Sequence, residues 1–224
     1  MMDVLARDGY SILPETIPLG TIASVVIALE NSRSRKGAGI RNVLRIPAVR
    51  SLAEDVNLLG LVKRVLGERT VPFRATLFDK SAKSNWLVVW HQDTALPLRE
   101  KQDVQGWGPW SVKEGVICSH APARALEQVL AARVHLDDST SENGPLRVLP
   151  GTHTLGVLTD DQIHDFSSTK QAVECRVGVG GVLLMRPLLV HASSKARSDR
   201  SRRVLHIEYA SQLLCGDGLE LAVD

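Results

Sequence analysis

Short apolar segments separated by turn residues run from residue 71 almost to the end of the chain, and they constrain its fold most. Short runs rich in β-branched residues and bounded by glycine and proline favour β-strands. Many such strands with turns between them predict a β-sandwich or a jelly roll. The strands expected are Val71–Asp79, Asn85–His91, Val112–Cys118, Ala132–Asp137, Leu146–Leu149, Ala172–Val177, Val182–Met185, Leu188–Ala192 and Val204–Ser211.

Helices are predicted mainly before this β region. The apolar stretch Leu19–Ser32 has the pattern of a helix. Ser51-Leu-Ala-Glu54 is a capping-box sequence and predicts a helix over Leu52–Leu66, which Gly67 ends. One further helix is predicted inside the β region, over Pro122–Leu130, because its apolar residues share a helical face.

The chain length of 224 residues suits one domain and a substantial core. We expect a single domain over residues 1–224, with a helical extension at 1–70 and a jelly-roll core at 71–211. The formal charge of +2 is too small to indicate a nucleic-acid partner. No uncharged apolar stretch is long enough to span a bilayer, so no membrane partner is expected either. The sequence does not predict the oligomeric state.

The cysteines indicate a reducing environment. Cys118, Cys175 and Cys215 are odd in number and far apart, and no C-x-x-C pattern occurs. This disfavours a disulfide framework and a thiolate zinc site. The N-terminus lacks the basic start and apolar core of a secretory signal. We therefore expect a cytoplasmic protein.

His91-Gln92-Asp93 follows an apolar run that ends at Trp90. Side chains at i and i+2 of a strand point the same way, so His91 and Asp93 can converge on one ion. His191, far downstream, can supply a third ligand. Two imidazoles and one carboxylate are the ligand set of an open non-haem Fe(II) site, with positions left for a chelating cosubstrate and O2. The alternative is that a histidine at a strand end is only a hydrogen-bonded surface group.

Two other H-x-[DE] matches occur, His135-Leu-Asp137 and His206-Ile-Glu208. Roughly one match is expected by chance in a chain of this composition, since short motifs are weak signals. The match at His91 is preferred because a strand there gives way to a polar loop, where functional residues gather.

Three separated motifs carry a family resemblance. They are Trp90-His91-Gln92-Asp93, the segment from Ser141 to His153, and the segment from His191 through Arg202. With these motifs in this order, the chain resembles the phytanoyl-CoA dioxygenase family. That family consists of Fe(II)- and 2-oxoglutarate-dependent enzymes on a double-stranded β-helix, a cupin-like jelly roll. The resemblance covers roughly residues 71–211.

The resemblance implies an iron site and a cosubstrate site. Its iron ligands and catalytic centre would be His91, Asp93 and His191, and Arg202 would anchor the distal carboxylate of 2-oxoglutarate. Ser193 matches a position whose hydroxyl helps to hold that cosubstrate. A guanidinium suits this task because it can meet a carboxylate with two parallel hydrogen bonds. Strand parity alone does not separate Arg202 from Arg200; the family's spacing selects Arg202.

Other positions in the cosubstrate and substrate pocket are expected from weaker matches. Arg133 and Thr76 fall where relatives line the cosubstrate. For Arg133 the alternative is an ion pair with Asp137 or Asp138. His135 shares strand parity with Arg133 and can line the substrate cavity, although a neutral core histidine is the preferred interpretation.

Trp107 and Trp110 lie on a glycine-containing loop after the metal motif. They are expected either to form a substrate lid or to cover the outside of the barrel. The chain has Ala192 and Ala196 where phytanoyl-type enzymes have glycine and asparagine, which argues against a fatty acyl-CoA substrate.

The expected function is therefore O2-dependent hydroxylation of a C–H bond in a small-molecule metabolite, with release of succinate and CO2. Two alternatives remain open at this point. One is a non-catalytic or metal-only jelly-roll binding protein, and the other is an oxygenase acting on nucleic acid, which would need a basic groove with stacking aromatic residues.

Overall fold

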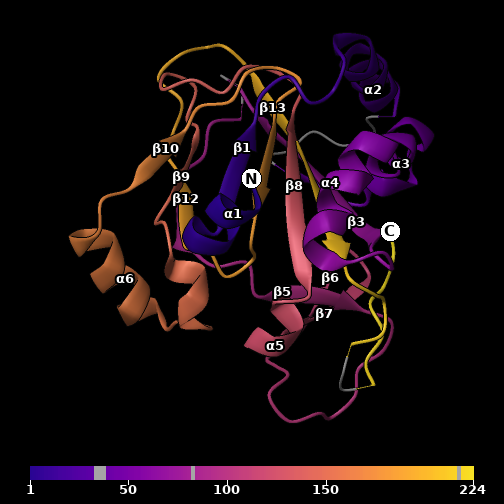
Figure 1. Ribbon diagram of the computed structural model, residues 1–224, viewed down its shortest axis with the longest axis vertical. Helices are drawn as coiled ribbons and strands as arrows, with labels where there is room; N and C mark the ends of the chain where they lie inside the picture. The colour runs from indigo at the N-terminus through magenta and orange to yellow at the C-terminus, as the bar shows by residue number, and fades with distance from the viewer. Residues whose placement is uncertain (33–38, 82–83, 216–217) are drawn as a thin grey trace.

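The computed structural model describes residues 1–32, 39–81, 84–215 and 218–224. Its core consists of three antiparallel sheets (Figure 1). The major sheet has the order β1 (Tyr10–Leu13), β11 (Val182–Met185), β8 (Val129–His135), β13 (Arg202–Ala210), β3 (Val71–Lys80) and β2 (Gly39–Ile40). The facing sheet has the order β10 (Val173–Cys175), β9 (Leu146–Val148), β12 (His191–Ser193) and β4 (Val88–His91). The small sheet has the order β5 (Ala95–Leu98), β7 (Val116–His120) and β6 (Trp110–Lys113).

Strand β13 shows how the sequence gives the major sheet two different faces. Leu205 and Ile207 belong to a large apolar core. Arg202, His206 and Glu208 alternate with them and border a cavity on the other face. Because side chains on a strand point alternately to its two faces, this pattern sets an apolar outer face against a polar inner face.

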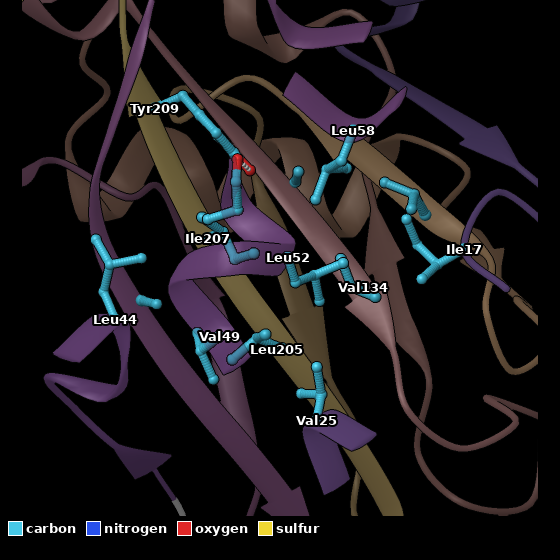
Figure 2. Close-up of a cluster of buried hydrophobic side chains, with 14 of the residues drawn as sticks. Ile17, Val25, Leu44, Val49, Leu52, Leu58, Val134, Leu205, Ile207 and Tyr209 are labelled. Atoms are coloured by element: carbon cyan, nitrogen blue, oxygen red, sulfur yellow. Dashed lines mark hydrogen bonds between the residues drawn. The ribbon is translucent and has the colours of Figure 1, made fainter. Parts of the chain in front are cut away.

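The helices are α1 (Met2–Asp8), α2 (Leu19–Asn31), α3 (Pro47–Ala53), α4 (Val56–Leu66), α5 (Ala123–Leu126) and α6 (Asp160–Thr169), with short 3-10 turns at Val43–Arg45 and Thr152–Leu155. Helices α2, α3 and α4 cover the outer face of the major sheet, whereas α6 packs against β4 of the facing sheet. Figure 1 shows α2, α3 and α4 together on one side of the sheet. Figure 2 shows Val49 of α3 and Val25 of α2 near Leu205, and Leu58 of α4 farther along the same apolar cluster. The Tyr209 hydroxyl donates to the Ala53 carbonyl at 2.9 Å, so this buried polar group is also satisfied.

The predicted helix over Leu52–Leu66 is in fact two helices, α3 and α4. The expected cap at Ser51 is wrong, because this residue lies inside α3. Pro47 begins α3 instead, a position where its missing N–H costs nothing. Asp55 caps α4, and its carboxylate accepts from the backbone N–H of Leu58 at 3.3 Å.

The predicted helix over Pro122–Leu130 is also too long, because only α5 is helical there. Val129 and Leu130 begin β8 and pair with Ala210 and Tyr209 of β13. Short apolar runs fit either structure, and here the neighbouring strand decides. The predicted strand Leu188–Ala192 is shifted, since β12 begins at His191.

The expected extension over residues 1–70 is not purely helical. Strands β1 and β2 come from it and form the two edges of the major sheet. The helix expected over Leu19–Ser32 is confirmed as α2. None of the helices in the described ranges is long and apolar enough to cross a membrane.

Candidate metal centre and its pocket

His91, Asp93 and His191 meet on the facing sheet. His91 of β4 is paired with His191 of β12, and Asp93 follows β4 by two residues. The Nε2 atoms of His91 and His191 lie 3.8 and 3.6 Å from the two carboxylate oxygens of Asp93. All three ligand atoms lie within 4.8 Å of one another, so they can hold one metal ion. The structure thus brings together the three residues that the sequence singled out.

Backbone carbonyls orient both imidazoles toward the carboxylate. The Nδ1 atom of His91 lies 2.8 Å from the Val89 carbonyl, and that of His191 lies 2.8 Å from the Leu189 carbonyl. A carbonyl oxygen only accepts, so each Nδ1 carries the proton and each Nε2 has a free lone pair. Metal-binding histidines commonly have this arrangement, because the donated N–H fixes the tautomer.

The charges of the triad also suit a metal ion. Burial lowers the pKa of His191 to about 4. Burial alone would raise the pKa of Asp93, but the nearby imidazoles, His191 first, and Arg74 lower it to about 2. An ionised carboxylate and a neutral imidazole are the forms that bind metals.

Gln92, between the two ligands of the motif, ties β4 to two other segments. Its amide nitrogen donates to the carbonyls of Leu188 and Gly156 at 2.7 and 2.9 Å. Its amide oxygen accepts from the Leu158 N–H at 2.8 Å. The Leu188 contact holds the segment that leads into His191, so Gln92 helps to keep the third ligand in place.

A cavity of about 370 Å³ adjoins the triad between the major and facing sheets. Its wall takes residues from β3, β8 and β13 on one side and from β4 and β12 on the other. The sequence-predicted site residues that line it are His91, Asp93, His191, Arg202, Ser193, Arg133 and Thr76.

The register between β3 and β13 arranges the inner face of the major sheet in rows. In order along the strands, the opposed pairs are Lys80 with Arg202, Phe78 with Val204, Thr76 with His206 and Arg74 with Glu208. Arg133 of β8 continues the row of His206. The row of Arg202 and the row of Glu208 therefore lie at opposite ends of the cavity wall.

Arg202 is 3% exposed and has no carboxylate within ion-pair distance in the described part of the chain. Its Nε atom is buried and has no hydrogen-bond partner there. Burial and the nearby Arg133 guanidinium lower the pKa of Arg202 to about 9. A buried cation without a partner is costly. This environment fits an anionic ligand such as the distal carboxylate of 2-oxoglutarate.

Arg133 is a second buried cation in the same wall. One of its terminal nitrogens donates to His206 Nδ1 at 3.0 Å, and its guanidinium lies 5.4 Å from the centre of the Phe78 ring. The alternative expected for it, an ion pair with Asp137 or Asp138, is wrong. The Asp138 carboxylate accepts from the backbone N–H of Val179 at 2.8 Å. Asp137 is bound instead by Arg203, with a contact of 2.8 Å. Arg133 therefore also faces the cavity without an anionic partner among the described residues.

The Ser193 hydroxyl is already engaged. It donates to the Gly144 carbonyl at 2.8 Å and accepts from the Lys80 ammonium at 2.8 Å. A hydroxyl has one hydrogen to donate. Ser193 thus has no free hydrogen for a bound anion unless the Gly144 contact breaks.

Sequence reasoning missed a charged group at the other end of the wall. Arg74 and Glu208 form a bidentate ion pair, and Arg74 also donates to the Ala95 carbonyl at 3.1 Å. His206 Nε2 lies 3.9 Å from a Glu208 oxygen. Sequence context favours the His91 match over His206-Ile-Glu208, yet His206 and Glu208 also line the cavity. Their strand parity with Arg202 was the signal that could have placed them there.

Three expected residues lie away from the cavity lining. Trp107 is 8% exposed and packs with Leu96 and Leu126, and Trp110 packs against the same cluster. This placement supports the outer-cover interpretation over the lid. His135 is buried but does not line the cavity, and burial lowers its pKa to about 3, so it is a neutral core histidine.

Known proteins of one enzyme family are similar in sequence to this chain. The family model for phytanoyl-CoA dioxygenase (PhyH) matches residues 32–204. L-proline trans-4-hydroxylase of Streptomyces griseoviridis is 26% identical over 178 residues, which are 68% of this chain and 59% of that protein. A probable phytanoyl-CoA dioxygenase of Caenorhabditis elegans is 26% identical over 108 residues. The chain spans 59% and 34% of the lengths of these two relatives.

Solved structures share the fold. EctD from S. alaskensis, with 2-oxoglutarate and 5-hydroxyectoine, has a TM-score of 0.71 and 19% identity, covering 94% of this chain and 74% of that one. HygX from Streptomyces hygroscopicus, with nickel and 2-oxoglutarate, has a TM-score of 0.67 and 17% identity, covering 93% and 85%. These matches confirm the predicted jelly-roll class, and iron and 2-oxoglutarate are the predicted cofactors that such enzymes bind. The chain belongs to the phytanoyl-CoA dioxygenase (PhyH) family.

Proposed function

We propose that this chain is an Fe(II)- and 2-oxoglutarate-dependent oxygenase that hydroxylates a C–H bond of a small polar molecule. The observation that carries the proposal is that the His91, Asp93 and His191 ligand set and Arg202, whose guanidinium forms no ion pair with any described residue, line one cavity. The bound iron and cosubstrate would supply the activation of O2, with succinate and CO2 released. The protein's own residues bind, orient and enclose the reactants.

The triad would hold iron through two imidazole nitrogens and one carboxylate oxygen, which leaves the remaining coordination positions free. Arg202 would meet the distal carboxylate of the cosubstrate with two parallel hydrogen bonds. This contact would also satisfy the guanidinium nitrogen that lacks a partner in the described structure. The ligand and the protein would therefore each neutralise a buried charge of the other.

Arg133 and Thr76 would complete the wall beside the cosubstrate. Arg133 adds positive charge near Asp93. The Asp93 carboxylate would therefore interact with both the metal and this guanidinium. Thr76 stands opposite His206 and contributes a hydroxyl to the lining. Both residues are proposed as cosubstrate contacts, while Ser193 is proposed to shape the site through its bonds to Gly144 and Lys80.

The substrate is proposed to be small and polar. The cavity of about 370 Å³ must hold the cosubstrate as well as the substrate, and drug-sized ligands alone use about 300–1,000 Å³. The wall beyond the triad carries the Arg74 and Glu208 charges, which would be poor partners for an acyl chain. A fatty acyl-CoA is therefore disfavoured. The proline hydroxylase among the relatives is named for a substrate of the favoured size and polarity.

Anaerobic titration of the protein with Fe(II) and 2-oxoglutarate tests the proposal. We expect a weak visible charge-transfer band, followed on exposure to O2 by succinate formation even without substrate. Replacement of Asp93 by Ala should abolish the band and the turnover, because the only anionic ligand of the set is lost. Asp165→Ala, on an exposed turn of α6, is the matched control and should behave like the wild type.

The alternatives give different outcomes in the same assays. A metal-only binding protein would bind Fe(II) but give neither the band nor succinate. An oxygenase acting on nucleic acid would bind oligonucleotides with a steep salt dependence. Succinate formation that survives Asp93→Ala would mean that the ligands are misassigned.

A further inference from the structure

Two buried cations stand opposite each other at one end of the cavity wall. Lys80 of β3 is paired directly with Arg202 of β13. Lys80 is fully buried and Arg202 is 3% exposed. Like charges directly opposite each other on neighbouring strands destabilise a sheet. The structure thus places a repulsive pair where the sheet could have placed apolar side chains.

The contacts of Lys80 satisfy its hydrogen bonds but not its charge. Its ammonium donates to the Ser193 hydroxyl at 2.8 Å and to the Ser194 carbonyl at 2.5 Å. The Trp86 ring centre lies 5.2 Å away. All of these partners are neutral, and within the described ranges no carboxylate forms an ion pair with Lys80.

At the other end of the same two strands, a buried cation is paired with a carboxylate of the protein itself. Arg74 and Glu208 occupy the equivalent opposed positions and neutralise each other. The row of Lys80 and Arg202 lacks such an acidic partner. An anion that enters the cavity can supply it, and Ser193, which Lys80 holds, lies on the cavity lining.

We propose that Lys80 is a positioning residue for the distal carboxylate of 2-oxoglutarate: it fixes the Ser193 hydroxyl and adds its charge to that of Arg202. This inference rests on the proposed function, because it requires 2-oxoglutarate to occupy the cavity with its distal carboxylate at Arg202. Lys80 lies outside the lining, so it acts on the carboxylate through its electric field, while its hydrogen bond holds Ser193, which shapes this end of the lining. The two cations repel each other across the strand pair, and a carboxylate bound at Arg202 would balance both charges.

Anaerobic titration of the Fe(II)-loaded protein with two ligands tests this inference. The ligands are 2-oxoglutarate and its 5-amide, which keeps the keto acid and replaces the distal carboxylate by a neutral group. Lys80→Met removes the charge and the hydrogen bonds, and Lys80→Gln removes the charge but keeps a donor. We expect both variants to raise the Kd of 2-oxoglutarate about tenfold or more, and to change the Kd of the amide less than about twofold.

Lys63→Met is the matched control, because Lys63 lies on α4, among the helices on the outer face of the major sheet. It should leave both Kd values unchanged. An equal loss for both ligands would show a merely structural role, and unchanged 2-oxoglutarate binding in the Lys80 variants would show no role at all; either result overturns the inference. A wild-type protein that fails to bind 2-oxoglutarate refutes the proposed function instead. If Lys80→Met does not fold, Lys80→Gln alone decides.

Discussion

The imidazole of His206 carries its proton on the nitrogen nearer Glu208. A guanidinium can only donate, so the contact with Arg133 makes His206 Nδ1 an acceptor. Burial first, and then the Arg133 charge, lower the pKa of His206 to about 3, so the ring is neutral. His206 therefore adds no charge of its own to the cavity wall. Arg133, Arg202 and Lys80 are buried cations near the cavity that form no ion pair among the described residues.

Replacement of Arg202 by Met should separate ligand binding from stability. We expect the Kd of 2-oxoglutarate to rise about 100-fold, because a buried carboxylate would lose its guanidinium partner. The melting temperature of the ligand-free variant should not fall, since a buried unpaired cation is removed. Anaerobic titration and thermal unfolding measure the two effects. Arg200→Met, at an exposed neighbour, is the control, and equal affinities of the two variants would contradict the assignment of Arg202.

The opposition of Lys80 and Arg202 also predicts a pH dependence of stability. Burial, with a smaller effect of Arg202, lowers the pKa of Lys80 from 10.5 to about 8. Between pH 8 and 10.5 the unfolded chain therefore binds a proton that folded Lys80 has released, and this group makes folding more favourable as pH rises. We expect the melting-temperature difference between Lys80→Met and the wild type to shift in favour of the wild type across that range. A difference that stays constant with pH would be inconsistent with this explanation.

At the scale of elements, periodicity predicted the parity of side chains better than the ends of helices and strands. The convergence of His91 and Asp93 and the role of β13 follow from the two-residue period of a strand. The cap at Ser51 failed because a proline four residues earlier starts the helix sooner. Lys80 was not singled out because its importance depends on the register between β3 and β13, and a long-range register is not readable from either strand alone.

The N-cap of α4 gives a test at this scale. Asp55→Ala should lower the free energy of unfolding by about 1 kcal/mol, because two backbone N–H groups lose the carboxylate that accepts from them. Ser51→Ala, at an exposed position inside α3, should change it by less than about 0.5 kcal/mol. Urea denaturation measures both values. A larger loss of stability for Ser51→Ala than for Asp55→Ala would indicate that Ser51, and not Asp55, caps a helix.

For the whole molecule, the proposed ligands would join two sheets. His91 and His191 lie on strands of the facing sheet and Asp93 lies in the loop after β4, whereas Arg202 lies on β13 of the major sheet. A cosubstrate that chelates iron and reaches Arg202 would connect them. The fold class and the triad could be predicted from the sequence, but the charged rows of the cavity required the two sheets to be seen face to face (Figure 1).

This bridging predicts cooperative stabilisation. Mn(II), which is redox-stable in air, and 2-oxoglutarate should together raise the melting temperature by more than the sum of their separate effects. A ligand at 100 times its Kd stabilises the folded state by about 2.7 kcal/mol, so the difference is measurable by thermal unfolding. Additive shifts would indicate that the two ligands bind independently.

The most direct test of the central claim is anomalous diffraction at the iron edge from crystals grown anaerobically with Fe(II). We expect one strong peak about 2.2 Å from Nε2 of His91, Nε2 of His191 and a carboxylate oxygen of Asp93. A peak bound by other residues, or no peak at this triad in crystals that contain stoichiometric iron, would contradict it.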